Sequence, residues 1–466
     1  MRYEEYKTAE MPWINKIPAH WSQIRNGGLF EYHQDKVGAD FGKYQLLSLS
    51  VQGIRVKNIL DTSGKVPASY EGYQKVSDGD MVFCLFDLDC SAVFSGLSEL
   101  NGMITSAYDV MTPKCKIVNP KYLDYYFKAV FAGRYYKIFA KSVRYTINYD
   151  VFKALKSPVP PREEQDQIVR YLDWKVSCIN KLIHGYQRQI KLLEERRLFV
   201  INEAVTKGIE NGISFKDSGI RWIGEIPAHW HIVSLKRCAT LRSGITLGKK
   251  YPRNVELIEV PYLRVANVQN GYIDTSDVAT LLVTQEEAEK YRLSAGEVLM
   301  TEGGDRDKLG RGSVWNGSIS PCIHQNHVYA VKTNEQKLNN RFLEYLTVSN
   351  VAREYFDLTA TKTTNLASTN SSKVLAFPIP LPPIDEQQRI VEYLIQSDEK
   401  IQIAKSKIQK QLSLMQEYRT RLISDVVTGQ MDVRSVVVPD YTPEDDTEEN
   451  EADDETTDEE VSMDAD

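Results

Sequence analysis

Two histidines that flank two amide side chains form the most suggestive polar cluster of the chain. His324 and His327 enclose Gln325 and Asn326. Imidazole nitrogens often bind metals, but no Cys or carboxylate stands at ligand spacing beside them, which argues against a metal site. The amides of Gln and Asn can each form two hydrogen bonds with an adenine edge, as Arg and Lys can with guanine. The cluster therefore suits a surface that reads nucleic-acid bases.

Other side chains with the same chemistry lie on Gly-bounded or turn-rich stretches. In the second half of the chain these candidate DNA contacts are Arg242, Thr246, Lys249, Lys250, Arg264, Asn267, Arg306, Lys308 and Arg311, with Lys362, Thr364 and Asn365 further on. In the first half they are Ser50, Gln52, Arg55, Lys57, Lys141, Arg144, Tyr145 and Asn148. Each could equally be a solvated or structural side chain, and phosphate contacts are commoner than base contacts.

Residues for catalysis are hard to find. No P-loop pattern GxxxxGK[ST] occurs, so no nucleotide-driven motor is expected. The nearest match to the Asn-Pro-Pro-Tyr clamp of amino-methyltransferases is Asn119-Pro-Lys-Tyr122, which lacks the second Pro and opens a predicted helix. Gly303-Gly-Asp305 is better explained as a turn than as a phosphate-binding loop. We expect no catalytic residue, no bound metal and no cofactor.

The elements that must position the candidate residues occur twice along the chain. Ile17-Pro-Ala-His-Trp21 returns as Ile226-Pro-Ala-His-Trp230, at an offset of 209 residues. Glu164-Gln165, which follows a Pro-Pro pair, returns as Glu386-Gln387 at an offset of 222. This spacing is far longer than the roughly 20 to 50 residues of a solenoid repeat, so the chain is predicted to hold two copies of one half. Internal two-fold similarity suits a target with two halves, as a symmetric dimer suits a DNA palindrome.

Each half is predicted to run from a β-rich region to a long helix. Short runs of aromatic and β-branched residues, such as 44–51 and 81–86, lie between Gly, Asp and Pro residues, as is typical of strands. Pro-rich hinges at 157–161 and 377–383 then lead into helices, since Pro can precede a helix but cannot continue one.

Both predicted helices carry a long apolar stripe. Apolar residues recur every three or four positions from Ile168 to Leu193, and six of the eight matching positions in the second helix are apolar, the exceptions being Asp398 and Lys405. Such a stripe indicates a coiled coil or a helix bundle. Antiparallel packing of the two helices would bury both stripes and bring the chain end back to the first β-rich region.

These patterns together predict an α+β fold, with two β-rich, mixed domains joined by two long antiparallel helices that form a coiled coil. The motifs at Trp21 and Trp230 are expected to pack each domain against the helices. The predicted segments are the first domain at 1–155, the first hinge and helix at 156–210, the second domain at 211–376, the second hinge and helix at 377–435, and a disordered acidic tail at 436–466.

Charge is distributed unevenly along the chain. The net charge is -7 at pH 7, yet residues 440–466 hold 15 Asp or Glu and no Lys or Arg. Without that stretch the chain has 57 basic and 49 acidic residues, a mildly basic body that permits nucleic-acid binding. The tail could compete with DNA for this body, or it could simply aid solubility.

Cysteine usage and hydropathy bear on the compartment. The six cysteines are scattered and form no CxxC pair, so reduced thiols are expected. The sequence has no run of 18 apolar residues and no apolar signal core near Met1. We therefore predict a cytoplasmic location without a membrane span.

The ordered set of motifs, present twice, resembles the specificity subunit of Type I restriction–modification systems. The stretches that carry the resemblance are Ile226–Trp230, Arg242–Gly248, Pro261–Asn267, Gly296–Arg306 and Pro380–Gln388. The resemblance implies a non-catalytic subunit in which each variable region is a target recognition domain for one half of a bipartite site in double-stranded DNA. It also implies that the helices set the spacer and dock two methyltransferase subunits, which endonuclease and translocase subunits join. Outward polar residues such as Glu194, Glu195, Arg196 and Arg197 are candidates for that docking.

The first half departs from the fuller pattern of the second. It lacks a Ser-Gly-Ile-Thr-like segment and a Glu-Gly-Gly-Asp segment, so its loops cannot be matched position by position. Two other functions remain open from the sequence. One is a coiled-coil adaptor whose domains bind proteins, for which DNA binding would be absent or insensitive to salt. The other is a methyltransferase with unusual motifs, for which the isolated chain would bind a cofactor.

Overall fold

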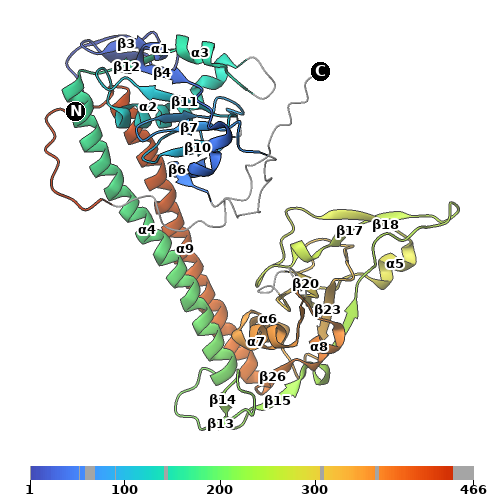
Figure 1. Ribbon diagram of the computed structural model, residues 1–466. Helices are drawn as coiled ribbons and strands as arrows, with labels where there is room; N and C mark the ends of the chain where they lie inside the picture. Colours follow the sequence, from blue (N-terminus) through green and yellow to red (C-terminus); the bar gives the residue numbers. More distant parts are fainter. Residues whose placement is uncertain are drawn as a thin grey trace. The chain divides into compact units, whose positions relative to one another are not determined.

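The computed structural model divides into two compact units, a first unit of Met1–Arg188 with Gln409–Asp466 and a second unit of Gln189–Ile408 (Figure 1). Two long helices, α4 (Arg162–Lys207) and α9 (Ile384–Val427), each contribute one part to either unit. The predicted domain boundaries stay a prediction, because these units divide the helices instead of separating them from the domains. The residues described are 2–51, 53–57, 69–89, 91–140, 145–304, 309–362 and 367–443.

The first unit is built on a four-stranded antiparallel sheet, in the order β4 (Phe30–His33), β11 (Asp109–Pro113), β8 (Met81–Phe83) and β9 (Ser95–Leu97). Phe83 meets Phe30, Phe127 and Phe152 at ring distances of 5.5, 5.1 and 4.9 Å, which joins the sheet to helices α2 (Pro120–Ala132) and α3 (Tyr149–Ala154). The other elements are β1 (Tyr6–Thr8), β2 (Lys16–Pro18), β3 (Ser22–Arg25), α1 (Asn26–Leu29), η1 (Gly38–Lys43), β5 (Leu47–Ser50), β6 (Gly53–Val56), β7 (Gln74–Val76), β10 (Gly102–Ile104), η2 (Tyr135–Phe139) and β12 (Lys156–Val159).

The second unit repeats this sheet in the order β16 (Ala239–Ser243), β23 (Val328–Thr333), β19 (Val298–Thr301) and β21 (Gly312–Val314). It adds one three-stranded sheet of β18 (Ala279–Val283), β17 (Ile258–Leu263) and β22 (Ile323–His324), and another of β20 (Gly303–Gly304), β25 (Ala367–Ser368) and β24 (Thr361–Lys362). The other elements are β13 (Phe215–Asp217), β14 (Glu225–Pro227), β15 (His231–Ser234), η3 (Leu235–Arg237), η4 (Val265–Asn267), α5 (Gln285–Lys290), α6 (Asn340–Val348), α7 (Asn350–Thr359), α8 (Ser371–Ala376) and β26 (Pro378–Leu381).

Strand register shows that the two four-stranded sheets are copies. His33 of β4 pairs with Val110 of β11, and Arg242 of β16 pairs with Ala330 of β23. The first members of these pairs are 209 residues apart, which is the offset of the Trp-bearing motifs. The duplication predicted from the motifs is therefore confirmed at the level of individual residues.

In the first unit, the Trp-bearing motif docks on the first turn of a long helix. Glu164 of α4 accepts hydrogen bonds from the indole N–H of Trp21 at 3.0 Å and from the hydroxyl of Tyr3 at 2.7 Å. The imidazole Nε2 of His20 lies 2.7 Å from the other carboxylate oxygen. Trp21 and Glu164 are both buried, so these bonds satisfy polar groups that water does not reach.

The second unit has the same arrangement on the other helix. Glu386 of α9 accepts from the indole N–H of Trp230 at 3.1 Å, and Nε2 of His229 lies 2.8 Å from its second oxygen. The expectation that both motifs pack against the helices is confirmed. The contact also explains why the Trp-bearing motif and the Glu-Gln pair recur together.

The long helices contact each other within each unit. In the first unit, Ile168 and Leu172 near the start of α4 share a core with Leu422 and Val426 near the end of α9. In the second unit, residues 201–205 of α4 share a core with residues 390–394 of α9. The helices therefore run in opposite directions where they meet, and their apolar residues are removed from water, which stabilises the contact by about 25 cal/mol per Å².

The two polar exceptions in the stripe of α9 have polar partners on α4. Asp398 accepts from the guanidinium of Arg197 at 3.0 and 2.9 Å, and Lys405 forms an ion pair with Glu194. The side chain of Arg197 is only 20% exposed. The interpretation of Arg197 as an outward docking residue is therefore wrong, because the helix contact holds its guanidinium.

The chain returns to the first unit after α9, as expected. Gln430 donates to the carbonyl of Lys16 at 2.9 Å, and Gln167 of α4 donates to the carbonyl of Val433 at 3.1 Å. Gly429 allows this close return, because a Cβ there would lie 2.3 Å from Cδ of Pro18 and its φ is +73°. Among the described residues, no helix is long and apolar enough to cross a membrane.

Candidate nucleic-acid interface

Three motifs that are distant in sequence converge in the second unit. The backbone N–H of Ile245 donates to the backbone carbonyl of His324 at 2.8 Å. The N–H of Asn326 donates to the carbonyl of Ile245 at 2.9 Å. The N–H of Gln325 donates to Leu263 at 2.9 Å, where β22 runs parallel to β17. The structure thus brings the candidate residues at 242–250, 264–267 and 325–326 to neighbouring backbone segments.

Gly244 makes the first of these contacts possible. A Cβ at this position would lie 2.0 Å from the carbonyl oxygen of His324 and 2.5 Å from that of Gln325. Backbone oxygens cannot move away as a flexible side chain could, so a larger residue would separate the two segments. This explains the Gly of the Ser-Gly-Ile-Thr segment.

Two further segments join through Glu302. Its backbone N–H donates to the backbone carbonyl of His327 at 2.9 Å, and its carbonyl accepts from the backbone N–H of Thr369 at 2.7 Å. Strand β25 pairs with both β20 and β24. The strands next to the candidates around 306 and 364 in sequence are therefore neighbours in one sheet. Arg306, Lys308, Thr364 and Asn365 themselves, and the side chain of Lys362, lie outside the described residues.

The carboxylate of Glu302 holds an exposed histidine. Nδ1 of His327 lies 2.5 Å from one oxygen, and the hydroxyl of Tyr329 donates to the other at 2.5 Å. Burial, and then the hydrogen bond to Glu302, raise the pKa of Tyr329, so its hydroxyl stays a donor. Sequence analysis placed His327 in a cluster that suits base reading, but it did not identify the contact of His327 with Glu302. The spacing of His327 and Tyr329 was the available signal, since residues two apart in an extended segment lie on one face.

His324 has a different role from His327. It is fully buried, and its Nδ1 donates to the carbonyl of Val328 at 2.6 Å. Burial lowers its pKa to about 4, so the imidazole is neutral at physiological pH. Within the described residues, no group of three or more His, Cys, Asp or Glu side chains could hold a metal ion.

Some candidate residues serve the scaffold. Arg242 forms a fork with the buried carboxylate of Glu297 at 3.2 and 2.7 Å and also donates to the carbonyl of Arg292. Asn267 is 3% exposed, and its amide donates to the carbonyls of Asp274 and Asp277 at 2.9 and 2.8 Å. The residue types permitted a DNA contact, but the fold uses these polar groups, so both side chains serve the scaffold instead.

Arg264 and Lys249, two further candidate residues of the second unit, also have carboxylate partners. Arg264 donates to Asp277 at 2.8 Å, and Lys249 pairs with Glu287. Burial alone would raise the pKa of Glu287, but Lys249 and Tyr251 hold it at about 2. Because the side chain of Asp277 is 88% exposed, a phosphate could compete for Arg264.

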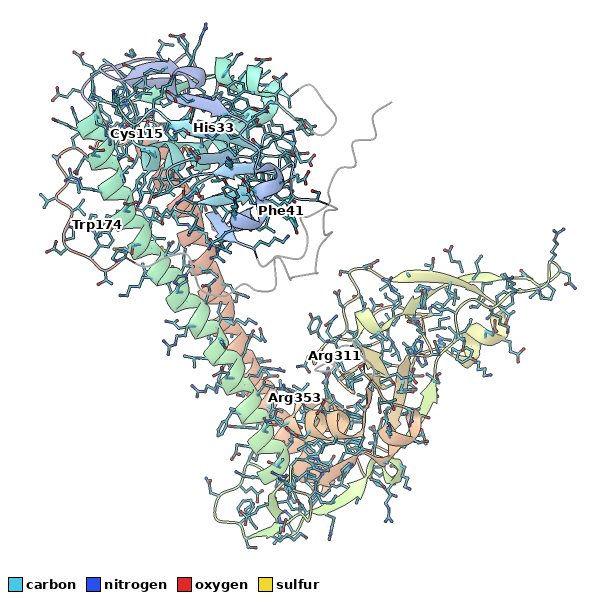
Figure 2. The ribbon with its side chains drawn as sticks, in the orientation of Figure 1. His33, Phe41, Cys115, Trp174, Arg311 and Arg353 are labelled. Carbon is cyan, nitrogen blue, oxygen red and sulfur yellow. The ribbon has the colours of Figure 1, made fainter. Side chains whose placement is uncertain are left out.

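The remaining candidates of the second unit present polar groups to solvent. Thr246 and Lys250 are exposed, and Gln325 and Asn326 are half-buried. For these four side chains, no hydrogen bond or ion pair occurs within the described part of the chain. Arg311, labelled in Figure 2, is half-buried and already has an interaction of its own.

The candidates of the first unit lie on two separate segments. The β5–β6 hairpin carries Ser50, Arg55 and Lys57, of which Arg55 is exposed and Ser50 donates to Gly53 at 3.0 Å. Lys57 has an interaction of its own. Gln52, Lys141 and Arg144 lie outside the described residues.

The second of these segments precedes α3. Asn148 caps that helix by accepting from the N–H of Val151 at 3.0 Å, and the ring of Tyr145 lies 4.1 Å from the ammonium of Lys137. Asn370 caps α8 in the second unit in the same way. This equivalence aligns the segment that ends at Asn148 with the segment that ends at Asn370, and it gives Asn148 a structural role.

The two units also share an acidic scaffold position, whose side-chain partners the sequence did not reveal. Asp80 of the first unit stands where Glu297 stands in the second, and each accepts at 2.8 Å from the backbone N–H three residues before it. His33, labelled in Figure 2, lies 3.7 Å from Asp80 and thus occupies the place of Arg242. The differing residue types at 33 and 242 concealed the match.

The comparisons with known proteins agree with this architecture. Residues 227–414 match the family described as the Type I restriction modification DNA specificity domain. The chain is 26% identical over 455 residues to the Type I restriction enzyme MjaVIII specificity subunit of Methanocaldococcus jannaschii, covering 93% of this chain and 98% of that relative. It is 24% identical over 245 residues to the EcoKI specificity subunit of Escherichia coli, covering 52% and 50% of the two chains.

A solved structure supports the fold. A chain from a study of complex assembly and conformational transition of the type I R-M system superposes with a TM-score of 0.63 at 16% identity, covering 89% of this chain and 99% of that one. The chain therefore shares the fold of that structure, and residues 227–414 in its second half match the family of the DNA specificity domain.

Proposed function

We propose that this chain is the DNA-recognition component of a Type I restriction–modification complex and that each unit reads one half of a bipartite site in double-stranded DNA. The convergence of five sequence segments around Gln325, Asn326 and His327 is the observation that carries this proposal. Thr246, Lys250, Arg264, Gln325 and Asn326 are the proposed contacts among the described residues. Lys249, Arg311 and Lys362 belong to the same set, as do Arg306, Lys308, Thr364 and Asn365 on the adjoining stretches.

The first unit is proposed to read the other half-site through different side chains. Its hairpin with Arg55 and Lys57 and the segment at Tyr145 are the candidates within the described residues, with Gln52, Lys141 and Arg144 beside them in sequence. Since most hydrogen bonds to DNA go to the backbone, the cations of this set are phosphate contacts first.

The long helices are proposed to pair as a coiled coil that sets the spacer between the half-sites. Seven residues inserted after Arg188 and seven after Ile408 fall between the two units and leave each unit intact. They add about 10 Å of helix, which corresponds to a spacer longer by up to about three base pairs. Altered bases at an unchanged spacing would contradict this role.

The helices also carry apolar side chains that suit protein partners. Leu182, Leu192, Phe199, Ile403, Leu414 and Tyr418 are between 45% and 64% exposed. Apolar exposure repeated along both helices favours a docking surface, which we assign to two methyltransferase subunits that endonuclease and translocase subunits join. Glu195 and Arg196 remain polar candidates for the same surface.

In this proposal the chain itself is non-catalytic, uses no cofactor and works in the cytoplasm. The test is methylome sequencing of a naive host that expresses this chain with the methyltransferase encoded beside it, against a host with the methyltransferase alone. A split methylated motif that depends on this chain is the expected result. A verified soluble complex without new methylation would instead favour a coiled-coil adaptor.

A further inference from the structure

The turn of residues 325–327, which we call the tip of the second unit, carries an exposed histidine. The ring of this residue, His327, is held by the carboxylate of Glu302. Residue 302 is held at its backbone N–H by His327, at its carbonyl by Thr369, and at its two carboxylate oxygens by His327 and Tyr329. The Glu302 side chain is 25% exposed and that of His327 is 53% exposed. The carboxylate is therefore a support, and the imidazole is the group that faces outward.

The pairing determines which ring atom is available to a ligand. An ionised carboxylate only accepts hydrogen bonds, so Nδ1 of His327 is the donor to Glu302. Nε2 then has no hydrogen-bond partner among the described residues, and in the neutral ring it is an acceptor. In the major groove such an acceptor suits the amino group of adenine or cytosine.

Charge separates a base contact from a phosphate contact. The pair of Glu302 and His327 has a net charge of zero when the ring is protonated and of minus one when it is neutral. The negative pair is repelled by a phosphate and the neutral pair has no net charge to attract one, whereas base edges are neutral. Its neighbours Gln325 and Asn326 are uncharged amides, so the whole tip has the chemistry of base readout.

We propose that Nε2 of His327 contacts the edge of one base in the half-site read by the second unit, and that Glu302 is its positioning residue. This inference rests on the proposed function and deepens it. It adds His327 to the contact set and assigns the tip to specificity, while Lys250 on the neighbouring loop belongs to the phosphate contacts.

The test compares His327→Ala with His231→Ala, an exposed histidine of β15, in the complete methylating complex. His327→Ala should reduce discrimination at one base pair of one half-site by roughly tenfold, seen as a relaxed position in the methylated motif. The salt dependence of DNA binding should keep its slope, whereas a lost phosphate contact lowers the slope by about one. An unchanged motif, or a slope lowered by about one, would overturn the assignment.

Glu302 is tested by coupling. Glu302→Ala should relax the same base pair as His327→Ala, and the double variant should relax it no further, because both changes remove one interaction. Glu302→Gln keeps an acceptor for Nδ1 and should restore much of the discrimination. Additive effects, or relaxation at a different base pair, would remove the positioning role. If the unaltered complex methylates no split motif at all, the proposed function itself is wrong.

Discussion

The two units keep one scaffold and differ in what they present on it. Asp80 and Glu297 occupy equivalent turns, but the first carboxylate lies 3.7 Å from His33, whereas the second is held by the fork of Arg242 at 3.2 and 2.7 Å. In the first unit, Thr112 donates to Asp80 at 2.6 Å. Different residues can therefore satisfy the same buried acid, so residue identity is a poor guide to equivalence at this position.

The tips of the units differ more than their scaffolds. The strand equivalence that aligns Ala330 with Val110 aligns Gln325, Asn326 and His327 with Thr105, Ser106 and Ala107. A backbone turn recurs at both places, with N–H donors from Val328 to Gln325 at 2.9 Å and from Tyr108 to Thr105 at 3.3 Å. The backbone is kept while the side chains that face outward have changed, which is what two readers of different half-sites require.

The largest expected effect tests the shared part of the comparison. Trp21→Ala and Trp230→Ala should each lower the free energy of unfolding by about 3–5 kcal/mol, because each removes a fully buried indole and takes one hydrogen-bond donor from a buried Glu. Hydrogen exchange read separately for the two units measures the effect. If one variant strongly lowers the protection of its unit and the other variant leaves its unit unchanged, the Trp21–Glu164 and Trp230–Glu386 contacts are not equivalent.

A smaller effect depends on a difference between the units. His324 is buried with a pKa of about 4, and the equivalent residue of the first unit is Ile104. The unfolded chain takes up a proton near pH 6.5, which the folded imidazole does not bind until about pH 4. Stability of the second unit should therefore fall by up to about 3 kcal/mol between these pH values. His324→Ile should flatten that slope, and an identical slope in the variant would refute the assignment.

Loss of the partner of Asp80 and loss of the partner of Glu297 should lower the stability of the two units by unequal amounts. Arg242→Ala should destabilise the second unit by about 2 kcal/mol, because Glu297 is left buried without its charged donor. His33→Ala should cost about 1 kcal/mol, since Thr112 still donates to Asp80. Chemical denaturation followed by unit-specific hydrogen exchange compares them. Equal costs would mean that the fork has no special role.

The smallest effect concerns the acidic tail. Residues 1–188 and 409–443 contain 29 Lys or Arg and 24 Asp or Glu, and residues 444–466 add 14 acidic residues and no basic ones. Removing 444–466 from the complete complex should raise non-specific DNA affinity several-fold at low salt, with no change in the methylated motif. The gain should vanish at high salt. Unchanged affinity at low salt would leave the tail with a solubilising role only.

Sequence patterns predicted the duplication, the helices and the return of the chain, because repeated motifs and apolar stripes are local signals. They could not predict the convergence on Glu302, which arises from backbone pairs between segments 25 or more residues apart. Residue type made Arg242 and Asn267 plausible DNA contacts. In the structure, however, Arg242 is held by Glu297, and Asn267 is buried. His327 was ambiguous for the same reason, since its partner Glu302 lies in a distant segment, between β19 and β20.

The most direct test of the two-reader account exchanges residues 1–155 for the matching region of another specificity subunit and sequences the resulting methylome. The account predicts that one half of the split motif changes completely, while the other half and the spacer stay the same. A motif altered in both halves, or in neither, would contradict the assignment of one half-site to each unit.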